Sequence, residues 1–275
     1  MMKTALEPAW RFRYEGLSGY VYGGHEHGLY LTAGIDGSGV TRTMCLNVEH
    51  YYARTHRGGR FVPRNKAEIR AEQTAEDTVT VRIAPYGTWK VETRVSYTLL
   101  SDRVIEARYD FSFGAAYKDF EVFISNYFLA DTEPHVHIGG RWVQPRLGGR
   151  EHRYWARSRR DAEVIADGRL AEFLSEEKEP YIVPVDPLLY DYPIMITPVG
   201  EMGWSVVNMV EKAICPSISA NRTWQAHDFS LIGHDVNEGQ QIAGRAWLVY
   251  TKLESLDEAI LLYNRLTGES ASNAR

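Results

Sequence analysis

The run Val-Glu-Thr-Arg-Val-Ser-Tyr-Thr-Leu at residues 91–99 alternates largely apolar with polar side chains. Successive side chains of a strand point to opposite faces, so this pattern predicts a half-buried β-strand. After a short turn at Ser101–Asp102, residues 105–113 continue the alternation. We therefore predict an antiparallel hairpin with one face on a core.

Other segments favour the same class of structure. Residues 121–128 are almost continuously apolar, which predicts a strand covered on both faces. Residues 255–266 have helical spacing and a capping-box start, Ser255 with Glu258, and predict one short C-terminal helix. Further strands are expected at 203–210, 224–233 and 240–250.

Two segments predict irregular structure. Residues 139–160 are rich in glycine, arginine and histidine and read as a long loop. Residues 180–198 are rich in proline, and each proline lacks the backbone N–H that a helix or strand would use as a hydrogen-bond donor. The sequence thus predicts an all-β fold, a large antiparallel sandwich forming a single domain over residues 1–275.

Charge and cysteine content exclude several classes of protein. The chain has 275 residues, a formal net charge of -5 and only two cysteines. A net negative charge disfavours nucleic acid as a partner, and two cysteines do not make a secreted disulfide scaffold. The first residues carry no apolar run typical of a signal peptide, and no stretch approaches the roughly 20 apolar residues of a membrane span. We expect a cytoplasmic protein with no membrane partner; its oligomeric state stays open.

The segment from residue 211 to residue 234 is the densest collection of catalytic residue types. Glu211, Arg222, Trp224 and His227 offer a carboxylate, a clamp for hydroxyl or carboxylate groups, an aromatic plate and an imidazole. These are the parts that a sugar site needs. On an extended chain Arg222 and Trp224 share one face, whereas His227 lies on the other.

Two His-x-His pairs raise the alternative of a metal site. His25 with His27, and His135 with His137, would each share one face of a strand and present two imidazoles. A cupin-type site also needs a carboxylate four residues beyond the second histidine, and the sequence has none there. We therefore expect no metal and no cofactor.

Several ordered stretches resemble the galactose mutarotase-like superfamily, which includes aldose 1-epimerases. They are residues 58–65, with Gly58-Gly59 and Arg64-Asn65, the paired strands of 89–113, Ser125-Asn126-Tyr127-Phe128, and 237–240. The resemblance implies a β-supersandwich with a carbohydrate ligand on its concave face. The sequence has Ser125-Asn126 where epimerases carry their general-acid histidine, which implies diverged chemistry.

The leading functional prediction is a carbohydrate-active enzyme that moves a proton on a sugar or uronic acid, of epimerase, isomerase or lyase type. Its ligand would be a small saccharide. One alternative is a non-catalytic carbohydrate-binding or accessory protein, and another is a metal-dependent, cupin-like β-barrel enzyme. The predicted catalytic residues are His227, His135 and Glu211, and the predicted substrate-binding residues are Arg222, Trp224, Tyr127 and His137.

Overall fold

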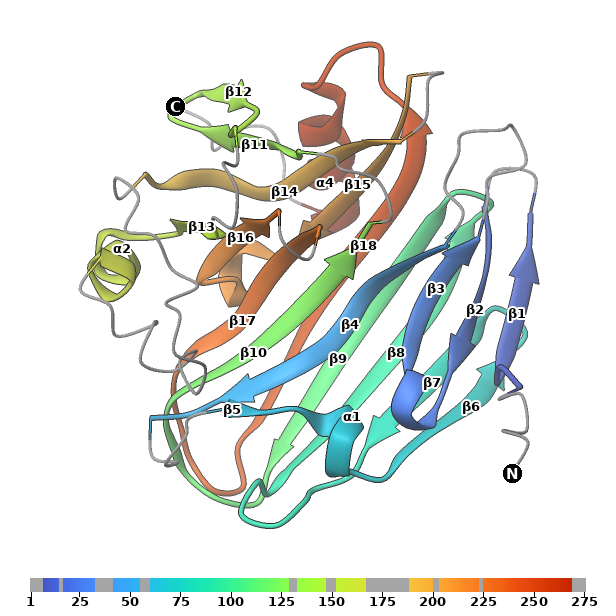
Figure 1. Cartoon of the computed structure of the whole chain (residues 1–275), viewed down its shortest axis with the longest axis vertical. Coiled ribbons are helices and arrows are strands. Elements are labelled where there is room, and N and C mark those ends of the chain that lie inside the picture. The colour runs from blue at the N-terminus through green and yellow to red at the C-terminus, as the bar shows by residue number, and fades with distance from the viewer. Residues whose placement is uncertain are drawn as a thin grey trace.

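The computed structural model describes residues 7–14, 17–32, 42–54, 60–128, 133–146, 152–166, 188–199, 203–222 and 225–268. In these ranges the chain forms two antiparallel sheets that pack face to face, with sheet A in front of sheet B in Figure 1. Sheet A has the strand order β1-β2-β3-β4-β10-β17-β16-β13, and β5 pairs with β4. Sheet B has the order β12-β11-β14-β15-β18-β9-β8-β7-β6.

The strands of sheet A are β1 (Trp10–Arg13), β2 (Ser18–Tyr22), β3 (Gly28–Thr32), β4 (Arg42–Tyr52), β5 (Arg60–Phe61), β10 (Tyr117–Tyr127), β13 (His152–Ala156), β16 (Ser217–Asn221) and β17 (Ala226–Val236). Those of sheet B are β6 (Ile69–Ala75), β7 (Thr78–Ile83), β8 (Val91–Ser101), β9 (Val104–Phe113), β11 (His135–Ile138), β12 (Arg141–Val143), β14 (Tyr190–Val199), β15 (Trp204–Val210) and β18 (Gln241–Lys252). The helices are α1 (Pro63–Lys66), α2 (Arg159–Ala166) and α4 (Glu258–Thr267), with the 3-10 turns η1 (Gly24–Glu26) and η2 (Lys212–Ile214).

The predicted hairpin is confirmed. Strands β8 and β9 pair from Val91 opposite Phe113 to Leu99 opposite Ile105, and their burial alternates along both strands. The predicted strand at 121–128 is β10, which lies inside sheet A between β4 and β17. The C-terminal helix is also confirmed as α4, although it begins at Glu258 rather than at Ser255.

Two predicted irregular segments contain strands. Within 139–160 the chain forms β12, β13 and the start of α2, and β13 pairs with β16. Within 180–198 it forms most of β14. Pro193 is tolerated because the pairing of β14 with β11 shifts register between Tyr192 and Met195. A bulge leaves a residue out of the hydrogen-bond ladder. The backbone N–H that Pro193 lacks is therefore not needed for pairing at this position.

Apolar packing occurs in three layers. The largest cluster fills the space between the sheets and includes residues from Trp10 to Tyr250. A second lies on the outer face of sheet A, the face turned away from sheet B, where α2 covers Phe123 and Tyr154. A third lies on the outer face of sheet B, where α4 covers Trp247. Within the described ranges, no helix is long and apolar enough to cross a membrane; the single-domain boundary stays a prediction.

Candidate functional site

A β-bulge in β4 turns consecutive polar residues onto the outer face of sheet A. On β10, Phe123 and Ile124 are neighbours, but their partners on β4 are His50 and Val48. Glu49 is therefore the additional residue of the bulge. A bulge bends its strand and re-aims a side chain, which is why bulges recur beside active sites. Glu49 reaches the same face as His50 and its side chain is only 1% exposed.

A second bulge, at Leu46, is held by hydrogen bonds from both sheets. Leu46 has a φ of 54°, a conformation that costs a bulky residue about 1–3 kcal/mol. Its carbonyl accepts hydrogen bonds from the hydroxyls of Tyr97, at 3.0 Å, and Tyr109, at 2.8 Å. Its N–H donates to Asn126 Oδ1 at 2.9 Å, and Asn126 Nδ2 donates to the carbonyl of His227 at 2.7 Å. These buried bonds fix the course of β4 beside β10.

The register of sheet A aligns a row of polar side chains on its outer face. Asn47 lies opposite Ser125, which on its other side lies opposite Asp228, and Asp228 lies opposite Ser219. Directly opposed residues share a face and have neighbouring side chains. We call Asn47, Ser125, Asp228 and Ser219 the polar row. All four are buried, and Oδ1 of Asn47 has no hydrogen-bond partner among the described residues.

Two carboxyl groups in this region lie in different electrostatic surroundings. Burial raises the pKa of Asp228 well above its usual value, and the nearby charge of Glu49 adds to the increase. Burial also raises the pKa of Glu49, but the charges of Arg64 and Arg60 oppose this. Arg64 donates a hydrogen bond to Glu49 Oε1, and Asn47 Nδ2 donates to Oε2 at 3.3 Å. Asp228 therefore favours the neutral acid, whereas Glu49 has cations that favour its carboxylate.

A third acid extends the group along β10. Burial raises the pKa of Glu121 to about 7, and the hydroxyl of Ser230 partly offsets this. The electrostatic surroundings of Tyr52 and Tyr154 include both Glu121 and Asp228. We call Glu49, Glu121 and Asp228 the acid cluster. A carboxyl group that titrates near neutral pH suits general acid–base chemistry.

His50 connects the arginines to a tyrosine beside the acid cluster. Burial, together with the charges of Arg60 and Arg64, lowers the pKa of His50 well below its usual value, so the ring is neutral. Arg60 Nη2 lies 2.5 Å from His50 Nε2, and a guanidinium only donates, so Nε2 accepts. The ring proton is then on Nδ1, which donates to the hydroxyl oxygen of Tyr52 at 3.0 Å. The imidazole holds Tyr52 in place and does not carry charge.

One of the predicted site residues lies beside the acid cluster. Tyr127 ends β10 on the same face as Ser125, and it is half-buried. Burial raises the pKa of Tyr127, and the charges of Glu49 and Asp228 contribute to that shift.

His227 faces the other way. Its side chain is 1% exposed, its Nδ1 lies 2.7 Å from Thr197 Oγ1 of sheet B, and its ring packs on Phe128. The structure thus puts His227 between the sheets and its neighbour Asp228 on the outer face.

The other predicted residues are distributed over sheet B and the end of β16. His137 lies on β11 with its Nδ1 2.8 Å from Asp191 Oδ2, and His135 is half-buried two residues before it. Glu211 accepts one hydrogen bond from Nε of Arg245 and one from the Arg245 backbone N–H, and it forms an ion pair with Nη2 of the same arginine at 2.7 Å. Arg222 is exposed after β16. Trp224 lies outside the described residues. Among the described residues, His135, His137, Glu211 and Arg222 are not gathered around His227.

The two His-x-His pairs are not equivalent. His25 and His27 lie on η1 and at its end rather than on a strand, and His27 Nε2 bonds to the carbonyl of Val48 at 3.1 Å. His135 and His137 lie on β11 of sheet B. In the part of the chain that the structure describes, no group of three or more His, Cys, Asp or Glu side chains is arranged to hold a metal ion.

Sequence reasoning missed Glu49 and Glu121. Glu121 begins the apolar run of β10, and Glu49 lies in the segment Val48-Glu49-His50-Tyr51. Burying a carboxylate in a strand costs free energy unless the group has a function or a partner. A glutamate within an apolar segment was therefore the sequence feature that could have identified both residues. The bulges that give Glu49 its orientation have no local pattern in the sequence.

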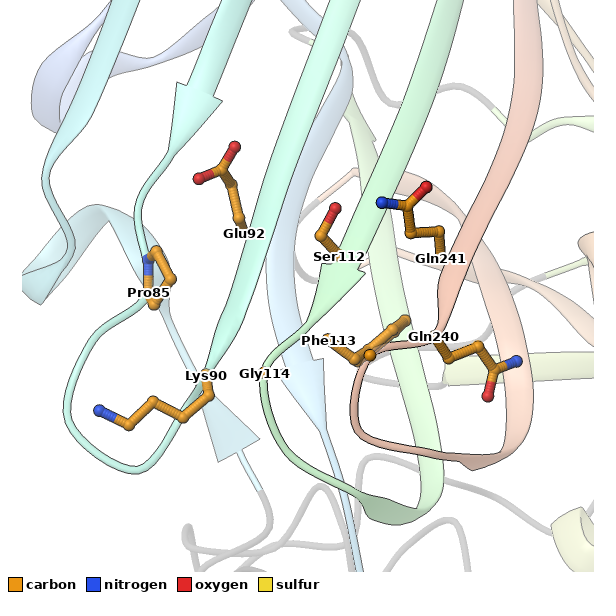
Figure 2. A pocket seen from close by; sticks show the side chains of 9 residues that line it. Pro85, Lys90, Glu92, Ser112, Phe113, Gly114, Gln240 and Gln241 are labelled. Atoms are coloured by element: carbon orange, nitrogen blue, oxygen red, sulfur yellow. The ribbon is translucent and has the colours of Figure 1, made fainter.

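A separate shallow pocket of about 400 Å³ lies at one end of sheet B (Figure 2). Glu92, Ser112 and Gln241 extend side by side from β8, β9 and β18, with Lys90 and Pro85 below them in that view. Its single carboxyl group, Glu92, accepts hydrogen bonds from Arg82 at 2.5 Å and Arg94 at 3.0 Å. These bonds lower the pKa of Glu92. This pocket therefore holds a permanent carboxylate and no acid–base pair.

No family model matches the sequence, and no curated protein matches it. Solved structures with the same fold include an α-N-acetylgalactosaminidase from Bifidobacterium bifidum, with 11% identity, a TM-score of 0.53, and coverage of 94% of this chain and 39% of that one. An α-mannosidase from Enterococcus faecalis has 10% identity and a TM-score of 0.52 over 97% of this chain and 32% of that one. A putative aldose 1-epimerase from Escherichia coli has 8% identity and a TM-score of 0.49 over 89% and 99%.

At these identities a structural likeness establishes the fold. The first two likenesses extend over nearly the whole chain, and the two packed antiparallel sheets agree with the architecture expected from the sequence. The chain is a large antiparallel β-supersandwich, an architecture that it shares with the α-mannosidase and the α-N-acetylgalactosaminidase over nearly its whole length.

Proposed function

We propose that this chain is a carbohydrate-active enzyme that transfers a proton to or from a sugar or uronic acid at the acid cluster. The observation that carries the proposal is the pair formed by Asp228 and Glu49: both acids are buried, and the charge of Glu49 helps to raise the pKa of Asp228. Arg64 and Arg60 lie near Glu49, and their charges favour its carboxylate. Two carboxyl groups whose surroundings separate their pKa values are suited to act as acid and base.

The surroundings assign the roles. Asp228 is the proton donor, because burial favours its neutral form. Glu49 is the base, because Arg64 stabilises its carboxylate. Tyr127 keeps its predicted role as a platform for the sugar ring, since it lies on this face beside both acids. Arg64 and Tyr127 are the more exposed members of the group, and Arg64 is 39% exposed, so a ligand would approach from their side.

The choice of a saccharide has independent support. Proteins that share this fold are described as an α-mannosidase and as an α-N-acetylgalactosaminidase in complex with GalNAc. Beside the acid cluster, the polar row offers hydroxyls and an amide, and Tyr127 offers an aromatic ring on the same face, which matches a ligand with many hydroxyls and apolar C–H faces. Epimerisation, isomerisation and elimination all require this kind of proton transfer.

The test is a panel of reducing sugars and uronic acids followed by proton NMR in D2O. A substrate is recognised by deuterium entering a C–H position or by a new product. On that substrate, Asp228→Asn and Glu49→Gln should each lower turnover by about 100-fold or more. Asp110→Asn is the matched control, because Asp110 pairs with Arg108 on the opposite side of the molecule. Wild-type rates in both acid variants would reject the proposal.

The panel also separates this enzyme from a binding protein. Burial of Asp228, at 2% exposure, is the observation that favours a non-catalytic role, because a donor must reach its substrate. Sugars that raise the melting temperature without any deuterium exchange or product would support that alternative.

A further inference from the structure

Three tyrosines form a cluster on the outer face of sheet A, away from the acid cluster. Tyr20 stacks on Tyr30 with ring centroids 5.4 Å apart, and Tyr22 meets both rings edge-on, at 4.9 Å from Tyr20 and 5.7 Å from Tyr30. Tyr20 and Tyr22 are half-buried. Beside them, the hydroxyls of Ser18 and Thr32 are 2.7 Å apart. We call Tyr20, Tyr22 and Tyr30 the tyrosine cluster.

The strand register connects this cluster to the proposed active site. Tyr20 lies opposite Tyr30, Tyr30 opposite Met44, Met44 opposite Tyr127, and Tyr127 opposite Ala226. Opposed residues share a face, so this is one apolar row across five strands. The polar row lies one step along the strands, with Asn47 beside Gly28 and Gly28 opposite Tyr22. Rings and hydroxyl-binding groups thus run in parallel across the sheet.

Gly28 keeps the two rows in contact. It has a φ of 118°, which favours glycine, and a side-chain carbon there would lie 2.6 Å from Asn47 Oδ1. The missing side chain leaves room for the Asn47 oxygen against Gly28, and that oxygen is one of the buried side-chain atoms without a hydrogen-bond partner among the described residues.

We infer that the tyrosine cluster is a second sugar subsite and that the ligand is an oligosaccharide; this rests on the proposed function. From β2 to β17 there are four strand spacings, or about 19 Å. One monosaccharide cannot touch both Tyr20 and Asp228, whereas a chain of several units can follow the apolar row. Aromatic rings bind the C–H faces of such units, and the polar row accepts their hydroxyls.

The test compares chain lengths. Malto-, manno-, cello- and chito-oligosaccharides of one to five units are titrated by calorimetry, and turnover is measured alongside. We expect the recognised sugar to bind at least about tenfold more tightly at four units than at one. The double variant Tyr20→Leu/Tyr22→Leu retains apolar volume, and it should lose about 5- to 10-fold in affinity for four units with no change for one unit. Tyr86→Leu is the control, because Tyr86 is a 45% exposed tyrosine outside this face.

The outcomes separate the two proposals. If length has no effect and the double variant binds like the wild type, the subsite is rejected while turnover at the acid cluster stands. If the double variant also loses single units or melts early, the tyrosines are structural and the subsite is rejected. If no saccharide is bound or turned over, the proposed function is rejected and the subsite with it.

Discussion

The pKa values of carboxyl groups are shifted in opposite directions on the outer faces of the two sheets. On sheet B, Glu92 lies between Arg82 and Arg94, and hydrogen bonds from these arginines lower its pKa. On sheet A, burial raises the pKa of Asp228 and Glu121. Both faces consist of antiparallel strands, so the difference comes from what covers the strands.

The two outer faces differ in how deeply their charged side chains are buried. On sheet A, α2 packs on Phe123, and Asp228 and Glu121 are buried, whereas Arg82 and Arg94 at sheet B are more than half exposed. A carboxylate keeps its charge where cations or water reach it, and it favours its protonated form where neither does. The comparison therefore supports the proposal of acid–base chemistry on sheet A, whereas the outer face of sheet B carries surface ion pairs.

The largest expected effect concerns two neighbours on β17, His227 between the sheets and Asp228 on the outer face of sheet A. His227→Ala should lower the free energy of unfolding by about 3–4 kcal/mol, because it empties a core position and leaves the hydroxyl of Thr197 unpaired. Asp228→Asn should change it by less than about 1 kcal/mol, because an amide resembles the neutral acid. Urea denaturation measures both.

Activity provides the control for this pair. Turnover per folded molecule should survive in His227→Ala and fall in Asp228→Asn. A stable His227→Ala protein with lost turnover would instead restore His227 as a catalytic residue.

The next effect depends on pH. Glu121 binds its proton more tightly in the folded state, with a pKa of about 7 against 4.5, so the wild type loses stability as pH rises between these values. Glu121→Gln is always neutral and escapes this loss. The unfolding free energy of Glu121→Gln should exceed that of the wild type by about 3 kcal/mol at pH 8, and this difference should shrink towards pH 5. Denaturation curves at pH 5, 6, 7 and 8 measure the gap; a gap independent of pH would show that Glu121 titrates normally.

Sequence patterns predicted several of the regular elements of this molecule but did not predict the acid cluster. The hairpin of β8 and β9 was visible because its alternation is unbroken and its partners are adjacent in the chain. The polar row depends on pairings between β4, β10 and β17, which are distant in sequence. The parity argument separated His227 from Arg222, but it said nothing of Asp228 until the register of β17 was known.

Bulges explain why the sequence does not reveal which face of the sheet the side chains of β4 occupy. A bulge shifts the strand period by one residue, so Glu49 and Met44 cannot be assigned to a face by counting. Tyr127 lies on the same face as Ser125 because β10 pairs regularly with β17 from Glu121 onwards, and its role as a ring platform stays a prediction. Side-chain bonds between sheets, such as Tyr109 with Leu46, leave no local pattern at all.

Removing one of those bonds should give a moderate effect. Tyr109→Phe deletes a buried donor to the carbonyl of Leu46, and we expect a loss of about 1–2 kcal/mol in unfolding free energy. Turnover should also fall, since the bulge positions the strand that carries Glu49. Tyr86→Phe, at an exposed site, is the control and should change neither quantity. Equal stability of both variants would mean that the bulge does not need this bond.

The smallest effect comes from sheet B and has the opposite sign to that of Glu121. The pKa of Glu92 is lowered in the folded state, so its carboxylate stabilises the fold above the unfolded pKa and loses this contribution as pH falls. Glu92→Gln should therefore destabilise the protein at pH 7, by less than about 1 kcal/mol because its arginine partners are exposed. The difference should vanish near pH 3 and diminish in 1 M salt, where exposed charges are screened. Thermal unfolding of both glutamine variants at pH values from 3 to 8 compares the two faces directly. If Glu92→Gln gained stability with rising pH as Glu121→Gln does, the two sheets would not differ in the way proposed.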